Sequence, residues 1–288
     1  MTTAALLTSN EELDDVLAAE LAELAQRCIH GFSDNRPVSV TLVRSRLTNA
    51  LTGEPPLLVT ARRHGMLVGW CAVRSPEPGE VRARLWGPVV DPSMRRTGLG
   101  KRLLGTTVES VRGSLRSTDV PTDRAGAADF FTSEGWFELN RTTVLQGSPV
   151  RQAVETASGA DYPDPRELDH LVATAARRFG GHPPQFAAST LTRWRSDARF
   201  RPENLLVEPL TGSLLLALAQ RNLDTSELLL AELWAEPQAQ QPLVRSAQAI
   251  ADRLGLARIR AVTDGDPGPF LADGLRTTGI CQTFALDR

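Results

Sequence analysis

The sequence is poor in the residues that build metal sites and disulfide frameworks. Cysteine occurs three times in 288 residues, at Cys28, Cys71 and Cys281, and no two cysteines form a CxxC pair. Zinc sites and disulfide-rich domains need closely spaced or numerous cysteines, so neither is indicated. We therefore expect no bound metal, and we expect the three thiols to be buried in a reducing compartment.

The sequence also lacks an excess of charge of one sign and any long apolar run. A formal net charge of -2 gives no electrostatic reason to expect nucleic acid or an anionic membrane as a partner. Residues 1–10 carry no basic stretch, and the longest later apolar run, Leu214 to Ala219, is too short to cross a bilayer. We expect a cytoplasmic protein that acts on a small soluble molecule, and no feature indicates its oligomeric state.

Hydrophobic periodicity and turn residues divide the first half of the chain into a series of short elements. A mixed α/β domain is predicted, with an antiparallel meander and flanking helices. Its elements are helices at Glu11–His30 and after Pro37 (Val40, Val43, Leu47), strands at Leu57–Arg62, Met66–Arg74 and Val81–Asp91, a helix from Leu99 to Val111, a strand at Ser117–Pro121, a helix at Ala125–Glu134 and a strand at Trp136–Leu145.

The same order of elements begins again after a stretch rich in Gly, Pro, Asp and Ser, Arg151 to Pro165. We therefore predict two domains, residues 1–150 and 151–288. Either the domain is duplicated, which we favour, or two α/β domains resemble each other by chance. The repeated elements are helices near Arg166–Arg178 and Gln185–Ser196, strands at Asn204–Leu210, Ser213–Gln220 and Ser226–Glu236, a helix at Gln241–Leu254, a strand at Arg258–Val262, a short helix ending near Gly274, and a strand toward Leu286.

The most informative segment is Val90-Asp91-Pro92-Ser93-Met94-Arg95-Arg96-Thr97-Gly98-Leu99-Gly100-Lys101-Arg102, at a strand-to-helix junction. The first turn of a helix offers unpaired amide N–H groups and the positive end of the helix dipole, and both favour a bound anion. Gly98 and Gly100 let the backbone approach phosphate oxygens closely. No GxxxxGK[ST] loop is present, and a Rossmann fingerprint would need a third glycine. A purely structural helix cap is the alternative.

This order of strand, Val-x-Pro, Arg-x-x-Gly-x-Gly and helix resembles the acetyl-CoA-binding motif of the GNAT superfamily of N-acetyltransferases. The elements from residue 11 to 145 also follow that family's pattern. The resemblance implies that acetyl-CoA, or another acyl-CoA, is bound by this segment, with backbone groups of Val89 and Val90 on the pantetheine and thioester. Gly87 and Pro88 support a bulge or an early loss of ladder pairing there, although an ordinary edge strand is the alternative. The predicted cofactor-binding residues are Val89, Val90, Arg95, Arg96, Thr97, Gly98, Leu99, Gly100, Lys101 and Arg102.

The catalytic residues are not assigned by the resemblance. The family's proton-donating tyrosine corresponds to Phe131, and its asparagine about seven residues earlier corresponds to Arg124; the only tyrosine, Tyr162, lies in the predicted linker. Water, Cys71 or another group would have to donate the proton.

A few polar residues remain as weaker candidates. Asp119 and Asp123 are candidate bases, although solvated loop carboxylates are the more frequent case. Arg82 and Arg84 share one strand face and are weak candidates for holding a substrate carboxylate or phosphate; solvent-facing arginines are the alternative. For His64, His170 and His182 we expect structural or surface roles.

The second half lacks both family features, because Gln238 to Arg245 contains no glycine and Phe270 stands at the tyrosine position. We predict two tandem GNAT-like domains, the second degenerate, resembling mycothiol synthase and the tandem acetyltransferase of clavulanic acid biosynthesis in architecture alone. The predicted function is acyl-CoA-dependent N-acylation of a small-molecule amine. The alternatives are a non-catalytic acyl-CoA-binding or sensing protein and, with less support, an unrecognised acyl-CoA site in the second half.

Overall fold

The computed structural model describes residues 5–9, 11–28, 39–41, 43–44, 47, 58–74, 76, 81–111, 115–150, 165–196, 199–222 and 225–287. The chain divides into two compact units: unit 1 is Met1–Arg141 with Ile280–Arg288, and unit 2 is Thr142–Gly279. The last residues of the sequence thus belong to unit 1. The domain division after residue 150 stays a prediction, and the linker with Tyr162 lies outside the described residues.

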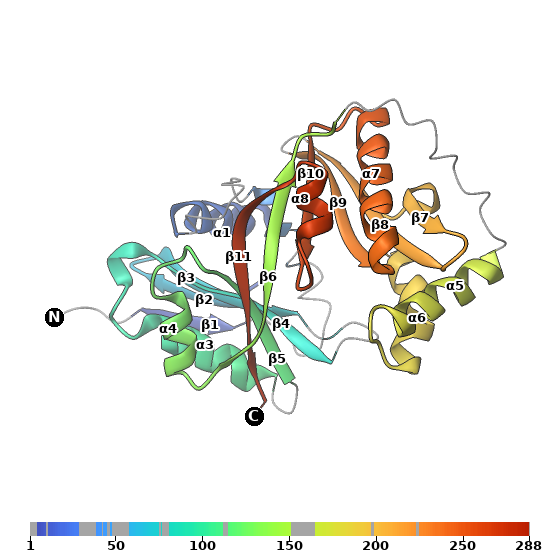
Figure 1. Ribbon diagram of the computed structural model, residues 1–288. Helices are drawn as coiled ribbons and strands as arrows, with labels where there is room; N and C mark the ends of the chain where they lie inside the picture. The colour runs from blue at the N-terminus through green and yellow to red at the C-terminus, as the bar shows by residue number, and fades with distance from the viewer. Residues whose placement is uncertain are drawn as a thin grey trace. The chain divides into compact units, whose positions relative to one another are not determined.

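Unit 1 is a mixed sheet with helices on both faces (Figure 1). Its elements are β1 (Leu6–Ser9), α1 (Asp15–Cys28), β2 (Leu58–Arg63), β3 (Met66–Arg74), β4 (Arg82–Val90), the 3-10 turn η1 (Pro92–Met94), α3 (Leu99–Ser110), β5 (Leu115–Pro121), α4 (Ala127–Ser133) and the first part of β6 (Phe137–Gly147). Residues 40, 41, 43, 44 and 47, in the second predicted helix, have helical backbone. The predicted meander and the helix after it are confirmed.

Strand β1 was not predicted. It has only four residues and pairs with β2, from Leu6 opposite Arg62 to Ser9 opposite Val59. A strand this short has too few alternating positions to show a pattern, and its partner lies far along the chain. A strand thus precedes the first predicted helix, and the order of elements expected from residue 11 onward is corrected in this respect. Helix α1 follows, capped by Asp14, whose Oδ1 accepts the Leu17 N–H at 2.7 Å.

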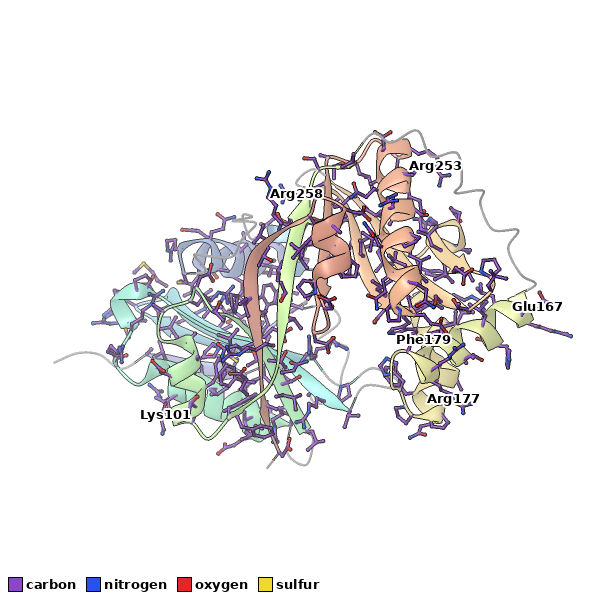
Figure 2. All side chains as sticks on the ribbon, viewed as in Figure 1. Lys101, Glu167, Arg177, Phe179, Arg253 and Arg258 are labelled. Atoms are coloured by element: carbon purple, nitrogen blue, oxygen red, sulfur yellow. The ribbon has the colours of Figure 1, made fainter. Side chains whose placement is uncertain are left out.

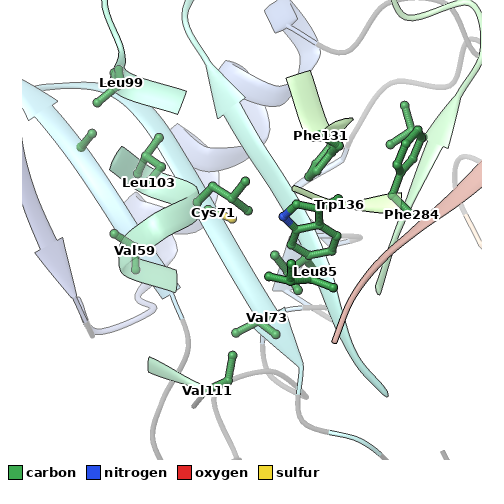
Figure 3. Close-up of a cluster of buried hydrophobic side chains, with 14 of the residues drawn as sticks. Val59, Cys71, Val73, Leu85, Leu99, Leu103, Val111, Phe131, Trp136 and Phe284 are labelled. Carbon is green, nitrogen blue, oxygen red and sulfur yellow. The ribbon is translucent and has the colours of Figure 1, made fainter. Parts of the chain in front are cut away.

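The sheet of unit 1 runs in the order β1, β2, β3, β4, β5 and then the last part of the chain's final strand, β11 (Arg276–Leu286). Residues Cys281–Leu286 of β11 pair antiparallel with β5. One face packs on α3 and α4 through an apolar cluster that includes Leu103, Phe131 and Phe284 (Figure 3). The other face packs on α1 around Trp70. Two apolar layers thus hold the sheet, and a strand from the end of the sequence completes it.

Unit 2 repeats this plan. Its elements are α5 (Pro165–Arg178), α6 (Pro184–Ser196), the 3-10 turn η2 (Pro202–Asn204), β7 (Leu205–Glu208), β8 (Ser213–Asn222), β9 (Thr225–Trp234), α7 (Pro237–Arg253), β10 (Arg258–Thr263), α8 (Gly268–Ala272) and the start of β11. The sheet order is β7, β8, β9, β10 and the last part of β6. Helices α7 and α8 cover one face, and α5 and α6 cover the other (Figure 1). The predicted repetition of elements is confirmed.

Helix α7 begins at Pro237, four residues before the predicted start at Gln241. Proline is well suited to the first helical position, where no N–H is needed. Pro242 lies inside α7, although proline is normally disfavoured there. Buried Ala239, on the turn before Pro242, packs with Leu243 in the core of unit 2, and this tertiary packing extends the helix past the proline.

Candidate functional site

Strands β4 and β5 of unit 1 separate partway along their length. They pair in parallel only at Arg82 with Leu115, Ala83 with Arg116 and Arg84 with Ser117, although β4 continues to Val90 and β5 to Pro121. Beyond Arg84, the β5-facing backbone edge of β4 has no ladder partner. The predicted loss of pairing near Gly87 and Pro88 is therefore confirmed.

A bulge in β4 lies beside this separation. Ala72 and Trp70 of β3 face Trp86 and Val89, so two steps on β3 match three on β4. Gly87 has φ +108°, and a Cβ there would lie 3.0 Å from the Trp70 carbonyl oxygen. Only glycine fits this position, which explains why the bulge forms at Gly87-Pro88.

After β4, a compact turn leads into α3. The Asp91 carboxylate caps the turn by accepting from Ser93 Oγ at 2.7 Å and Ser93 N at 2.9 Å, and the Ser93 hydroxyl lowers the Asp91 pKa. Thr97 Oγ1 donates to the Met94 carbonyl at 2.7 Å, and the Met94 side chain is buried. Arg96 (φ +62°) and Gly98 (φ +83°) have left-handed backbone conformations. The turn is thus fixed by its own polar contacts.

The backbone amides of residues 96–101 form an open cradle at the start of α3. The first helical hydrogen bond runs from Arg102 N to Gly98 O at 3.1 Å, and within the described chain no acceptor takes an N–H from residues 96–101. A Cβ on Gly98 would meet nothing within 4 Å, so this side of the turn is open. The Leu99 side chain is buried in the core and anchors the helix. Leu99 therefore contributes only its backbone N–H to the cradle. Free amides at a helix start are suited to phosphate oxygens.

The four predicted cations of this segment differ in their contacts. Lys101, labelled in Figure 2, forms a 3.1 Å ion pair with Glu134. Arg102 donates to the Ala5 carbonyl at 3.2 Å, and Arg95 donates weakly to the Cys28 carbonyl at 3.4 Å. Arg96 is exposed and has no ion pair among the residues that the structure describes. Arg95 and Arg96 are therefore the cations best able to turn toward an anion in the cradle.

Val89 and Val90 can offer only backbone groups. The Val89 side chain is buried beside α1, and Val90 packs against the first turn of α3, where its Cγ2 lies 3.7 Å from a Cβ built on Gly100. Both backbones pair with β3 on one side, opposite Trp70 and Gly69. Their other edge faces the separation from β5. This arrangement suits contacts to the amides of an extended ligand.

Arg82 and Arg84 lie on one strand face, as predicted, and both already hold carboxylates of the chain. Arg84 Nη2 is 2.7 Å from Asp119 Oδ2, and Asp119 Oδ1 accepts from Thr283 Oγ1 at 2.8 Å. Arg82 pairs with Asp287. A substrate anion would therefore have to compete with internal partners at both arginines. Asp123, the other candidate base, is exposed.

Phe131 and Cys71 are both part of the hydrophobic core (Figure 3). The Phe131 ring is 5% exposed and lies 5.3 Å from the Trp136 ring and 5.9 Å from the Phe284 ring. Burial raises the pKa of Cys71 to about 12, so its thiol is protonated at neutral pH. Neither residue offers an ionised group to the site.

One residue near the site was noted in the sequence only as a departure from the family. Arg124 follows β5 and precedes α4. Its side chain is half-buried, its Nε is fully buried without a hydrogen-bond partner among the described residues, and burial lowers its pKa. The sequence signal was an arginine in place of the family's asparagine.

Unit 2 keeps the strand separation and loses the cradle. Strand β9 has a bulge between Leu230 and Glu232, and its pairing with β10 ends at Leu230 although the strand continues to Trp234. Only Ala235 and Glu236 stand between β9 and α7. The Glu236 carboxylate accepts from Arg178 and Gln238, so the start of α7 carries its own anion.

Other potential site types find little support in the described part of the chain. No group of three or more His, Cys, Asp or Glu side chains there is arranged to hold a metal ion. Among the described helices, none has both the length and the apolar character needed to cross a membrane. His182 packs against the rings of Phe186 and Trp234 at 4.3 and 5.2 Å.

Comparisons with known proteins agree with this geometry. Residues 19–136 match the model of the acetyltransferase (GNAT) family. No curated protein matches the sequence. Among solved structures, a GCN5-related N-acetyltransferase from Sphaerobacter thermophilus is similar with a TM-score of 0.77 at 16% identity, covering 98% of this chain and 95% of its own.

Two further solved structures are also similar over nearly the whole chain. A tandem GNAT protein from the clavulanic acid biosynthesis pathway has a TM-score of 0.61 at 15% identity and 98% coverage of both chains. A GCN5-related glucosamine N-acetyltransferase region of a fungal multi-domain β-N-acetylglucosaminidase has a TM-score of 0.72 at 14% identity, over 99% of this chain and 38% of that one. The chain therefore has the fold of tandem GNAT proteins, with two GNAT-like domains, and its residues 19–136 match the GNAT family model.

Proposed function

We propose that the protein is an acyl-CoA-dependent N-acyltransferase that binds acetyl-CoA, or another acyl-CoA, in unit 1 and acylates a small-molecule amine. The observation that carries this proposal is the open amide cradle of residues 96–101, directly after a strand that separates from its parallel neighbour. The helix dipole and the nearby guanidinium groups of Arg95 and Arg96 favour a diphosphate there. Acyl-CoA is a co-substrate with this group.

The strand separation gives the rest of acyl-CoA a place to bind. The unpaired backbone edges of Val89 and Val90 can accept hydrogen bonds from pantetheine N–H groups and donate hydrogen bonds to pantetheine and thioester carbonyl oxygens. The amine nitrogen attacks the thioester carbon, the C–N bond forms, and the C–S bond breaks with its electrons left on sulfur. The amine loses a proton to a base, and the thiolate takes one up. With Phe131 in the core and Cys71 protonated, direct transfer with water carrying these protons fits the side chains present.

The test uses calorimetric titration with acetyl-CoA together with release of free CoA thiol in a panel of amines. Gly98→Glu places a carboxylate and a Cβ in the cradle, so we expect acetyl-CoA binding and thiol release to be lost. Gly212→Glu is the matched control, because Gly212 has φ +72° and equally open surroundings in a hairpin of unit 2. Unchanged acetyl-CoA binding in Gly98→Glu would contradict the assignment of the cradle.

A non-catalytic acyl-CoA sensor is the second candidate, favoured by one observation. Phe131 and its unit 2 counterpart Phe270 are both buried in apolar cores, 5% and 3% exposed, so neither unit has an acid at the family's position. Binding of acetyl-CoA without thiol release across the amine panel would establish the sensor. We expect one acyl-CoA per chain, because Glu236 occupies the start of α7 in unit 2. Two bound molecules would revive an acyl-CoA site in unit 2.

A further inference from the structure

Arg124 differs from Arg62 and Arg82, two half-buried arginines of unit 1 that hold carboxylates, and shares with Arg63 a buried Nε that has no hydrogen-bond partner among the described residues. Arg62, also half-buried, pairs with Glu11 at 2.8 Å and Glu20 at 2.6 Å. Arg82 pairs with Asp287. The Arg124 guanidinium has no ion pair among the described residues, its Nε is buried without a partner, and its electrostatic neighbours are Cys281 and Asp123. The loss of hydration is not compensated by a bound carboxylate of the described chain.

An uncompensated buried charge is costly, and folded proteins normally pair such groups or leave them in water. A guanidinium presents five donors in a planar fork that fits a carboxylate or phosphate. An arginine held in this state by the folded chain is therefore suited to an anion that arrives from outside. Burial lowers its pKa, but an arginine remains charged near neutral pH, so it stays able to bind that anion.

Arg124 follows β5 at the sheet edge where the cradle follows β4. Because β4 and β5 are parallel, their carboxyl ends lie at the same edge, the usual place for ligands of parallel strands. Helix α4, which begins after Arg124, touches the cradle: the Phe130 ring lies 3.6 Å from a Cβ built on Gly100. Arg124 therefore stands between β5 and α4, at the same edge of the sheet as the cradle.

The electrostatic neighbour of Arg124, Cys281, belongs to one particular face of the sheet. Cys281 lies two residues before Thr283 on β11, and Thr283 bonds Asp119 on the face opposite the Phe284 core. Helix α3 and its cradle cover the Phe284 side. Cys281, an electrostatic neighbour of Arg124, thus lies on the face away from α3, and this face is left for the second substrate of the transfer.

On these grounds we propose that Arg124 binds a carboxylate of the amine acceptor, so that the acceptor is an amino acid or another amine bearing a carboxylate. This inference rests on the proposed acyl-CoA-dependent function of unit 1. A carboxylate could also be carried by the acyl group of a dicarboxylic acyl-CoA. The chemistry at Arg124 would be the same, and the experiment separates these two sources.

The first measurement is thermal unfolding of the full-length protein. Arg124→Met removes an uncompensated charge and keeps most of the aliphatic stem, so we expect an unchanged or higher Tm. The matched variant Arg62→Met leaves Glu11 and Glu20 without their partner, and we expect its Tm to fall. A fall of several degrees in Arg124→Met would show that the guanidinium has a partner within the protein, and would overturn the proposal.

The second measurement compares amino acids with the matching amines that lack a carboxylate, using acetyl-CoA as donor. The pairs are leucine with 3-methylbutylamine and phenylalanine with 2-phenylethylamine. We expect the wild type to favour the amino acid in kcat/KM by about tenfold to hundredfold, the range of a charge-assisted hydrogen bond. Arg124→Met should lose this preference and Arg124→Lys should keep part of it, with the Kd of acetyl-CoA unchanged in both. Equal preferences in wild type and Arg124→Met would overturn the proposal.

The remaining arms use succinyl-CoA and binding without turnover. If Arg124→Met changes the ratio of Kd for succinyl-CoA to Kd for acetyl-CoA and leaves the acceptor preference intact, the carboxylate belongs to the acyl group, and the acceptor assignment is wrong. If no amine in the panel turns over, the rise in Tm that leucine and phenylalanine cause in the CoA-bound protein is compared between wild type and Arg124→Met. Equal rises in Tm overturn the proposal. Failure of the proposed function would give a different result, because the wild type would then not bind acetyl-CoA.

Discussion

Replacing Phe131 with tyrosine introduces the side chain that, by resemblance, GNAT N-acetyltransferases use at this position to protonate the departing thiolate. The structure predicts that this change harms the protein. Phe131 is 5% exposed, and its ring packs between Trp136 and Phe284 in the core of unit 1. A hydroxyl added to this ring would lie in an apolar cluster, and burying such a group without a hydrogen bond costs about 1–3 kcal/mol.

This cost can be converted into a melting temperature. For a protein of this size, 1 kcal/mol shifts Tm by roughly 2–4 °C, so we expect Phe131→Tyr to lower Tm by about 2–12 °C. The matched control is Phe270→Tyr, because Phe270 is 3% exposed at the corresponding position of unit 2. Both variants should lose stability by similar amounts in differential scanning calorimetry.

The activity of Phe131→Tyr shows whether the new hydroxyl lies in the core or reaches the active site. A correctly placed general acid accelerates acyl transfer by about 10²–10⁴-fold, and we expect no such gain. The assay measures thiol release at saturating acetyl-CoA for wild type and both variants. An increase of a hundredfold in Phe131→Tyr with an unchanged Tm would refute the reasoning, because the hydroxyl would then reach the reacting sulfur instead of the core.

Two further predictions follow from the core of unit 1. Ending the chain at Gly279 removes Phe284 and Leu286, whose burial stabilises unit 1 by about 1.5–3 kcal/mol each. We therefore expect unit 1 to be unfolded and readily cleaved in limited proteolysis, whereas a chain that ends at Asp287 should stay protected. A protected unit 1 in the shorter chain would contradict this prediction. The pKa of the Cys71 thiol is about 12 in the folded protein and 9.0 in the unfolded chain. The free energy of unfolding is therefore unaffected by this group below pH 9 and falls by about 1.4 kcal/mol per pH unit above pH 9. Urea unfolding of wild type and Cys71→Val between pH 9 and 10.5 should show this extra slope in the wild type alone, and equal slopes would be evidence against it.

The elements of both units could be predicted because their patterns are local. The hairpin between the predicted strands Asn204–Leu210 and Ser213–Gln220 and the glycine-marked turn before Leu99 depend on neighbouring residues, and the structure has both where the sequence indicated. The bulge could be anticipated from Gly87-Pro88 for the same reason: a glycine and a proline inside a strand disturb its ladder wherever the strand lies.

The contacts of the candidate site could not be predicted, because they depend on strands that are distant in sequence. Arg82 pairs with Asp287, and Asp119 is held by Thr283, in both cases through the insertion of β11 beside β5. No periodicity in either half of the sequence specifies that neighbour. The same long-range pairing decides that Arg124 lies close to Cys281, which the sequence alone could not indicate.

The position of β11 also has a consequence for biosynthesis. The ribosome makes residues 142–279, the whole of unit 2, before it makes residues 281–286, which pair with β5. Emerging domains commonly fold from the amino end as they are made, at about 5–20 residues per second. Here the earlier unit must wait for the later one, so a nascent chain interrupted anywhere within unit 2 leaves β5 without its neighbour.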